Sequence, residues 1–146
     1  MKKQLSFIFI LFFSFTTYFA SAQEVGIRFG DVVGNDVAID AVFELGKFSR
    51  IHADVSFGND FGIEALYDFL YRPVGAEENL HWYVGAGPSM LFSDPFFLGI
   101  SGEVGIEYHF SGAPIAIGAD WRPTFWLIEE TDFRAEGFGI NARYVF

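Results

Sequence analysis

The stretch Ser49–Arg72, SRIHADVSFGNDFGIEALYDFLYR, decides the fold because apolar and polar residues alternate along it in two runs. Ser49–Gly58 has apolar residues at every second position, and Gly62–Arg72 repeats the pattern. Successive side chains of a β-strand point to opposite faces, so each run predicts a strand with one apolar and one polar face. A helical period of 3.6 residues would mix charged side chains into both apolar faces. The turn-forming residues Asn59–Phe61 between the runs predict a hairpin.

The same period of two continues on both sides of this hairpin and predicts eight strands. They are Glu24–Gly30, Asp36–Gly46, Ser49–Gly58, Gly62–Arg72, Leu80–Leu91, Phe97–Phe110, Ile115–Phe125 and Gly137–Phe146. The longest connection between them is Trp126–Glu136. Consecutive antiparallel strands with short connections favour closure, since an open sheet would expose two apolar edges. The predicted fold is therefore all-β, an eight-stranded antiparallel up-and-down transmembrane β-barrel, for the reasons given below.

The first 22 residues have the three parts of a signal peptide. Met1–Gln4 is cationic, Leu5–Ala20 is apolar and rich in Phe, and Ala20–Ala22 has the small-residue pattern of a cleavage site. A membrane-anchoring helix is the alternative, but the apolar stretch is shorter than the roughly 20 residues that a span needs. The sequence thus predicts a signal peptide at residues 1–22, one β-barrel domain at residues 23–146, and export to the outer membrane.

Composition and charge exclude several functional classes. The 146 residues are 51% hydrophobic and carry a formal charge of −10, which argues against nucleic acid as a partner. Without the leader the charge becomes −12, and Lys47 is the only lysine left. The chain has no cysteine, so disulfides, thiolate nucleophiles and cysteine-bound zinc are excluded.

Two kinds of barrel fit this alternation. A soluble, lipocalin-like periplasmic barrel points its apolar face inward to bind an apolar ligand, whereas an outer-membrane barrel points that face toward lipid. The assigned apolar face contains no charged residue, and its many Phe, Tyr and Trp side chains are too bulky for an eight-stranded interior. The opposite face consists largely of glycine and of opposed charges. These features favour the membrane barrel.

The polar face then predicts an ion-pair network in the barrel interior. Its members are Arg28, Asp40, Glu44, Arg50, His52, Asp54, Glu64, Asp68, Arg72, Glu103, Glu107, His109, Asp120, Arg122 and Arg143. A planar guanidinium holds two carboxylates at once, so a closed interior is expected instead of an open pore. The surplus of acids over arginines must be offset by retained protons, by charged histidines, or by water and a cation. We expect replacement of Arg72 or Arg122 by Leu to loosen the barrel.

No residue pattern predicts catalysis or a cofactor. His52, Asp54 and Ser56 have the residue types of a triad, but side chains two apart on one strand face lie roughly 7 Å from each other. Glu107 and His109 with His52 and Asp54 are a weaker candidate for a metal site than for ion pairing. The sequence therefore predicts a protein that is not an enzyme and has no catalytic, cofactor-binding or metal-binding residues.

Several segments resemble the small eight-stranded outer-membrane β-barrel proteins of the OmpA/OmpX type, especially the short barrels of Bacteroidota-type bacteria. These segments are FGIEALYDFLYRP, WYVGAGPSM, LGISGEVGIEYHF, PIAIGADWRPTFW and the last strand GFGINARYVF. The resemblance implies that both termini face the periplasm. It also implies that the barrel-assembly machinery reads a C-terminal signal made of Ile140, Ala142, Tyr144 and Phe146.

Three functions remain open at this point. The first is a non-enzymatic, structural or interactive role in the cell envelope, with outer-membrane lipids and lipopolysaccharide as partners and a monomeric state. The second is an enzyme that modifies outer-membrane lipid, with a lateral gate where Pro88 and Pro123 lack amide donors. The third is a narrow porin-like channel, which the crowding of arginines in a small interior disfavours.

Overall fold

The computed structural model describes residues 23–129 and 131–146, so the predicted signal peptide lies outside the described residues. This part of the chain contains strands and turns and no helix. The strands are β1 (Glu24–Val32), β2 (Asn35–Gly46), β3 (Ser49–Phe57), β4 (Phe61–Val74), β5 (Glu77–Phe92), β6 (Phe97–His109), β7 (Ile115–Trp121), β8 (Thr124–Trp126), β9 (Asp132–Arg134) and β10 (Phe138–Val145). In the same residues, no helix has the length and hydrophobicity needed to cross a membrane.

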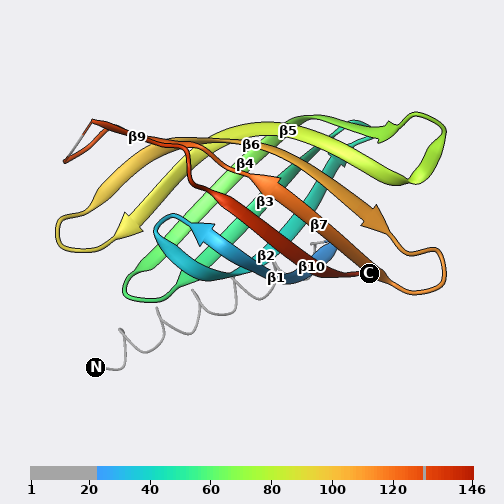
Figure 1. Cartoon of the computed structure of the whole chain (residues 1–146), viewed down its shortest axis with the longest axis horizontal. Helices are drawn as coiled ribbons and strands as arrows, with labels where there is room; N and C mark the ends of the chain where they lie inside the picture. Colours follow the sequence, from blue (N-terminus) through green and yellow to red (C-terminus); the bar gives the residue numbers. More distant parts are fainter. Residues whose placement is uncertain (1–22, 130) are drawn as a thin grey trace, which may run out of the picture.

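The strands close into an eight-stranded antiparallel up-and-down barrel (Figure 1). Each strand from β1 to β6 pairs with the next, β6 pairs with β7, β7 with β10, and β10 returns to β1. The short strand β8 pairs with β6 beyond the end of β7, and β9 pairs with β8. β7 and β8 together thus form the seventh strand of the barrel, and β9 and β10 together form the eighth. This confirms the prediction of an all-β, eight-stranded antiparallel up-and-down barrel.

Pro88 and Pro123, the two prolines considered from the sequence as a lateral gate, differ in their effect on the sheet. The predicted strand Ile115–Phe125 is interrupted at Pro123, where a proline cannot donate a ladder hydrogen bond. Across this break the Gly102 amide donates to the Pro123 carbonyl at 2.9 Å. Pro88 lies opposite Ile100 within the continuous register of β5 and β6. On the other side of β5 the ladder with β4 skips Pro88, because the paired residues go from Glu64 with Ser89 to Tyr67 with Ala86. Pro123 therefore ends a strand, whereas Pro88 interrupts the pairing on one side of β5 only.

Burial alternates along the strands as the period of two predicts, with the polar face inside. In β3, Arg50, His52 and Asp54 are at most 2% exposed, while the apolar residues between them lie on the outer face. The apolar core is small: Val32, Val33, Ala38 and Trp126 form one buried cluster, against which Leu91 and Phe97 pack. This cluster lies by the β1–β2 turn, at the end of the barrel opposite the chain termini.

A β-bulge in β4 corrects the predicted orientation of two residues. The register with β5 shifts between Asp68 and Leu70, so one extra residue is inserted into β4. Beyond the bulge Tyr71 lies opposite the buried Tyr83, and Arg72 lies opposite Trp82, which is 38% exposed on the outer face. The sequence had placed Tyr71 outside and Arg72 inside. A shift of one residue exchanges the two faces of a strand, so both predictions are wrong.

Candidate functional site

The candidate site is the set of charged side chains buried inside the barrel. Thirteen acidic or basic residues of the described chain are at most 5% exposed there: Glu24, Arg28, Asp40, Arg50, His52, Asp54, Glu64, Asp68, Glu103, Glu107, Asp120, Arg122 and Arg143. The alternation of the strands positions them, because each lies on the inward face of its own strand or beside the break at Pro123. All but Glu24 belong to the predicted network.

Arg122 contacts four carboxylates from four different parts of the wall. Its Nη1 lies 2.5 Å from Asp54 Oδ2 and 2.9 Å from Glu64 Oε1. Its Nε lies 3.0 Å from Glu103 Oε2, and its Nη2 lies 3.4 Å from Asp120 Oδ2. Arg122 lies in the break between β7 and β8, and its long side chain reaches across the interior to these acids. Arg122 is consequently the most highly connected cation of the site.

Arg143 on β10 joins acids from three other strands. Its Nε donates to Glu24 of β1 at 2.6 Å, and its Nη1 donates to Asp40 of β2 at 3.1 Å. Its Nη2 pairs with Glu107 of β6. The first, second, sixth and last positions of the barrel are thereby tied to a single guanidinium.

Arg50 fills the interior beside two tyrosine rings. It contacts Asp68 and Glu107, each at 2.7 Å. Its guanidinium carbon lies 4.3 Å from the ring centroid of Tyr71 and 4.4 Å from that of Tyr83. Cation–π contacts of this kind add to the ion pairs where solvent is excluded. The bulge in β4 thus contributes Tyr71 to the site, which sequence reasoning missed.

Arg28 pairs with Asp120 through two guanidinium nitrogens, near the opposite end of the interior. Arg28 Nη2 and Nε lie 2.5 and 2.9 Å from Asp120 Oδ1. Asn141 donates to the other carboxylate oxygen of Asp120 at 3.2 Å. A Cβ on Gly139 would overlap the guanidinium of Arg28 as it lies here, so this inward glycine leaves room for the long side chain.

His52 lies between two carboxylates at the centre of the barrel. Its Nε2 is 2.5 Å from Asp40 Oδ1, and its Nδ1 is 3.1 Å from Glu103 Oε1. A ring that donates from both nitrogens satisfies both acids. The hydroxyl of Ser56 instead accepts a hydrogen bond from Asn35 at 3.0 Å. His52 and Ser56 therefore do not form a nucleophile and base pair.

A chain of hydroxyl groups continues the network and was missed by sequence reasoning. Ser89 donates to Glu64 at 2.7 Å, and its oxygen lies 2.6 Å from that of Ser101, which lies 2.7 Å from the Thr124 hydroxyl. Ser101 is two residues before Glu103 on β6, so the same period of two places it on the inward face. The spacing of two residues between Ser101 and Glu103 was the sequence signal that could have identified Ser101 as an interior residue.

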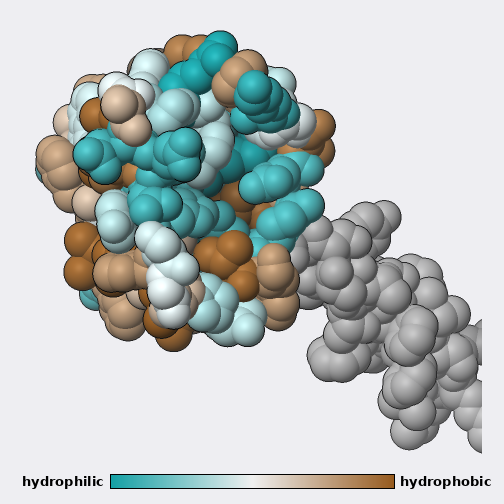
Figure 2. Space-filling view, turned by 90° about the vertical axis from the view of Figure 1, so that its right-hand side faces the viewer, coloured by the Kyte–Doolittle hydropathy of each residue, from teal (hydrophilic) through white to brown (hydrophobic). Residues whose placement is uncertain are grey.

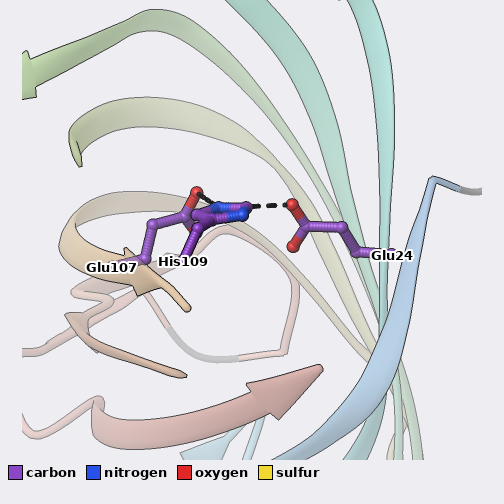
Figure 3. A group of neighbouring side chains, drawn as sticks. All are labelled: Glu24, Glu107 and His109. Carbon is purple, nitrogen blue, oxygen red and sulfur yellow. Dashed lines mark hydrogen bonds and ion pairs between the residues drawn. The ribbon is translucent and has the colours of Figure 1, made fainter. Parts of the chain in front are cut away.

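The structure places three predicted network residues differently from the rest. Glu44 is exposed at the barrel mouth and makes no ion pair with any described residue, while Glu24 takes part instead. Arg72 lies on the outer face, as described above. His109 is only half-buried, and its Nε2 lies 3.0 Å from Glu107 and 3.5 Å from Glu24 (Figure 3).

Three groups of side chains bring possible metal ligands together: Glu24, Glu107 and His109; Asp40, His52 and Asp54; and His52, Asp68 and Glu103. Guanidinium groups already pair with the carboxylates in each group. In Figure 3, for example, Glu24 approaches His109 from β1. Arg143, which the figure does not draw, pairs with both acids of that group. Of the four residues considered from the sequence as a metal site, Glu107 and His109 fall into one group, whereas His52 and Asp54 fall into another. Ion pairing accounts for all three groups, so we assign no metal to them.

Acids outnumber cations in the interior. Of the described residues, eight carboxylic acids, four arginines and His52 are buried there. Asp54 Oδ1 and Asp68 Oδ1 are buried without a hydrogen-bond partner among these residues. The network therefore holds carboxyl oxygens that no guanidinium reaches.

Three residues of the predicted C-terminal signal lie on the outer face of β10, and Phe146 directly follows that strand. Ile140, Tyr144 and Phe146 are 61%, 52% and 77% exposed, and Ala142 is exposed as well.

The chain matches no family model, no curated protein and no solved structure. The barrel assignment therefore depends on the strand pairing alone.

Proposed function

We propose that the protein is a non-enzymatic integral outer-membrane β-barrel with a closed polar interior and a structural or interactive role in the cell envelope. The observation that carries the proposal is the reversal of ordinary burial. Arg28 and Arg50 are at most 2% exposed, whereas Phe138 is 66% and Ile100 is 52% exposed. Globular proteins in water rarely bury charged side chains while leaving so many large apolar ones outside.

A lipid environment removes the cost of that outer face. Exposing apolar surface to water costs about 25 cal/mol per Å², and contact with acyl chains avoids this cost. Aromatic rings gather at one end in the series Phe57, Phe61, Phe92 and Phe96, whose successive centroids are 5.7, 5.7 and 5.4 Å apart. At the other end Tyr108 packs on Phe110 and Tyr144 on Phe146. Membrane barrels carry aromatic girdles at both interfaces.

The packed interior supports a closed barrel instead of a channel. An eight-stranded barrel is just wide enough for side chains to fill. Here Arg122 and Arg143 each reach carboxylates on several strands, and the buried apolar cluster with Trp126 lies at one end. The same charged interior argues against a lipocalin-like barrel, which needs an apolar lining for its ligand.

The remaining parts of the proposal follow from the resemblance given above. The termini face the periplasm, the outer strand face contacts membrane lipids, and the assembly machinery recognises the exposed residues at the end of β10. Lipopolysaccharide is the partner of the opposite rim, and the protein acts as a monomer without a cofactor.

Cell fractionation and a detergent gel test the proposal. We expect the protein in the outer-membrane fraction, with a band that migrates differently before and after boiling because a closed barrel resists detergent. We also expect no discrete current steps in a planar bilayer. A soluble periplasmic protein without a heat shift would contradict membrane insertion, and regular current steps would contradict the closed interior.

A further inference from the structure

Three lysine or arginine residues of the described chain stay outside the interior network: Lys47, Arg72 and Arg134. Two of them converge on one aromatic ring. The guanidinium carbon of Arg72 lies 3.5 Å from the ring centroid of Phe48, and Lys47 Nζ lies 5.2 Å from it. Neither cation makes an ion pair with any residue that the structure describes, although the chain is strongly acidic. Their positive charge is therefore available to a ligand.

These two cations line a hollow of about 610 Å³ at the end of the barrel that carries the chain termini. Its walls are the Lys47–Phe48 turn, the Tyr71–Pro73 segment, Glu78 and His81. Figure 2 faces this end, where hydrophilic side chains gather and hydrophobic ones lie more toward the margin. The rings of Tyr71 and His81 stack with centroids 4.7 Å apart and give the hollow one rigid wall.

The charge of the lining suits an anion. Lys47 and Arg72 face a single carboxylate, Glu78, so the lining has a net positive formal charge in a protein of net charge −10. A guanidinium fits two oxygens of a phosphate, and an ammonium adds a compact second charge. The cation–π contacts with Phe48 hold both groups near each other.

The position of the hollow identifies the source of that anion. Arg72 lies opposite Trp82 on the outer face, near the end of β4, and the hollow opens beside the turns at that end. In a membrane barrel this is the level at which tryptophan, arginine and lysine meet lipid headgroups.

We propose that the hollow between the Lys47–Phe48 turn and Arg72 binds the phosphate of a phospholipid headgroup from the leaflet on the side of the termini. This inference rests on the proposed membrane insertion. The lipid phosphate would contact Arg72 and Lys47, and its acyl chains would continue along the apolar outer face beside Trp82.

Native mass spectrometry of the detergent-solubilised barrel tests the inference. The probes are a short-chain phosphatidylglycerol, a diacylglycerol with the same acyl chains, and inorganic phosphate. Heat-dependent gel mobility and flotation with vesicles first establish that each variant is folded and inserted. Lys47→Gln and Arg72→Gln remove the two cations, and Arg134→Gln is the matched control, because Arg134 is an exposed cation on β9 near the opposite end.

We expect phosphatidylglycerol to bind the unaltered protein, and each of Lys47→Gln and Arg72→Gln to weaken its binding about tenfold, as the loss of one charge-assisted contact predicts. Arg134→Gln should bind like the unaltered protein. Equal binding of diacylglycerol, tighter binding of inorganic phosphate, or full binding by Arg72→Gln in an inserted barrel would overturn the inference alone. A protein that neither shifts on the gel nor floats with vesicles would overturn the proposed function as well.

Discussion

The guanidinium of Arg143 donates to the carboxylate of Glu24 at 2.6 Å and so joins the last strand of the barrel to the first across 119 residues of chain. The backbone ladder between β1 and β10 closes the same seam from Glu24 to Gly30. Both side chains are at most 3% exposed. Closure therefore depends on interior ion pairs as well as on backbone hydrogen bonds, and several variants can separate these contributions.

Arg122→Leu should destabilise the barrel strongly. The change leaves Asp54, Glu64 and Glu103 without their shared cation in a buried setting. Removing one partner of a buried ion pair costs about 3–5 kcal/mol of unfolding free energy. Urea unfolding in lipid vesicles, followed by tryptophan fluorescence, measures this loss. Arg134→Leu is the control, because its pair with Glu136 at 3.7 Å is exposed and should contribute at most about 1 kcal/mol. An unfolding midpoint for Arg122→Leu equal to that of the control would contradict the role of the network.

Arg72→Leu should leave the unfolding free energy within about 0.5 kcal/mol of the unaltered protein, as is usual for surface substitutions. This reverses the expectation drawn from the sequence, because the bulge places Arg72 on the outer face. The same urea titration measures whether Arg72 contributes to the unfolding free energy. A loss as large as that of Arg122→Leu would show that Arg72 supports the interior after all.

The bulge also shows where sequence reasoning ends. The period of two correctly assigned faces to Arg50, His52 and Asp54, because nothing interrupts the alternation of β3. The extra residue near Phe69 leaves no signal in the pattern, since Leu70 and Tyr71, which follow it, fit either face. The partners of Arg122 were equally hidden, because they depend on the register of strands far apart in the sequence. Glu24 and Ser101 lie at positions that the alternation does assign to the interior.

Gly26→Ala should impair closure of the barrel. A Cβ at this position would overlap the Ala142 carbonyl oxygen across the seam between β1 and β10. Backbone atoms cannot move aside as a flexible side chain does, so the cost is about 1–3 kcal/mol. The fraction of protein that refolds in detergent to the heat-sensitive gel form should fall. Gly112→Ala tests the general effect of alanine, because no atom lies within 4 Å of a Cβ at Gly112. Equal refolding of the two variants would contradict a tight seam.

Tyr83→Phe should be neutral or stabilising, whereas Ser101→Ala should destabilise. The Tyr83 hydroxyl is buried and finds no hydrogen-bond partner among the described residues. The Ser101 hydroxyl links Ser89 to Thr124. Leaving a buried polar group unsatisfied costs about 1–3 kcal/mol, so removal of the tyrosine oxygen carries no such loss while removal of the serine oxygen does. Paired urea titrations compare the two variants. Destabilisation by Tyr83→Phe above that of Ser101→Ala would show that the tyrosine oxygen has an important partner.

Val104→Arg distinguishes a membrane barrel from a soluble one. Val104 lies near the middle of β6 and is 47% exposed on the outer face, and Ile115 at the start of β7 is 42% exposed. In lipid an arginine costs about 2–4 kcal/mol at the bilayer midplane and about 0–1 near the interface. Unfolding of the two variants from phospholipid vesicles should therefore show a clear loss for Val104→Arg and a small one for Ile115→Arg. In water both positions are equally open to solvent, so a soluble barrel would tolerate both arginines alike. Equal stability of the two variants would accordingly contradict lipid contact along β6, whatever the detergent gel shows.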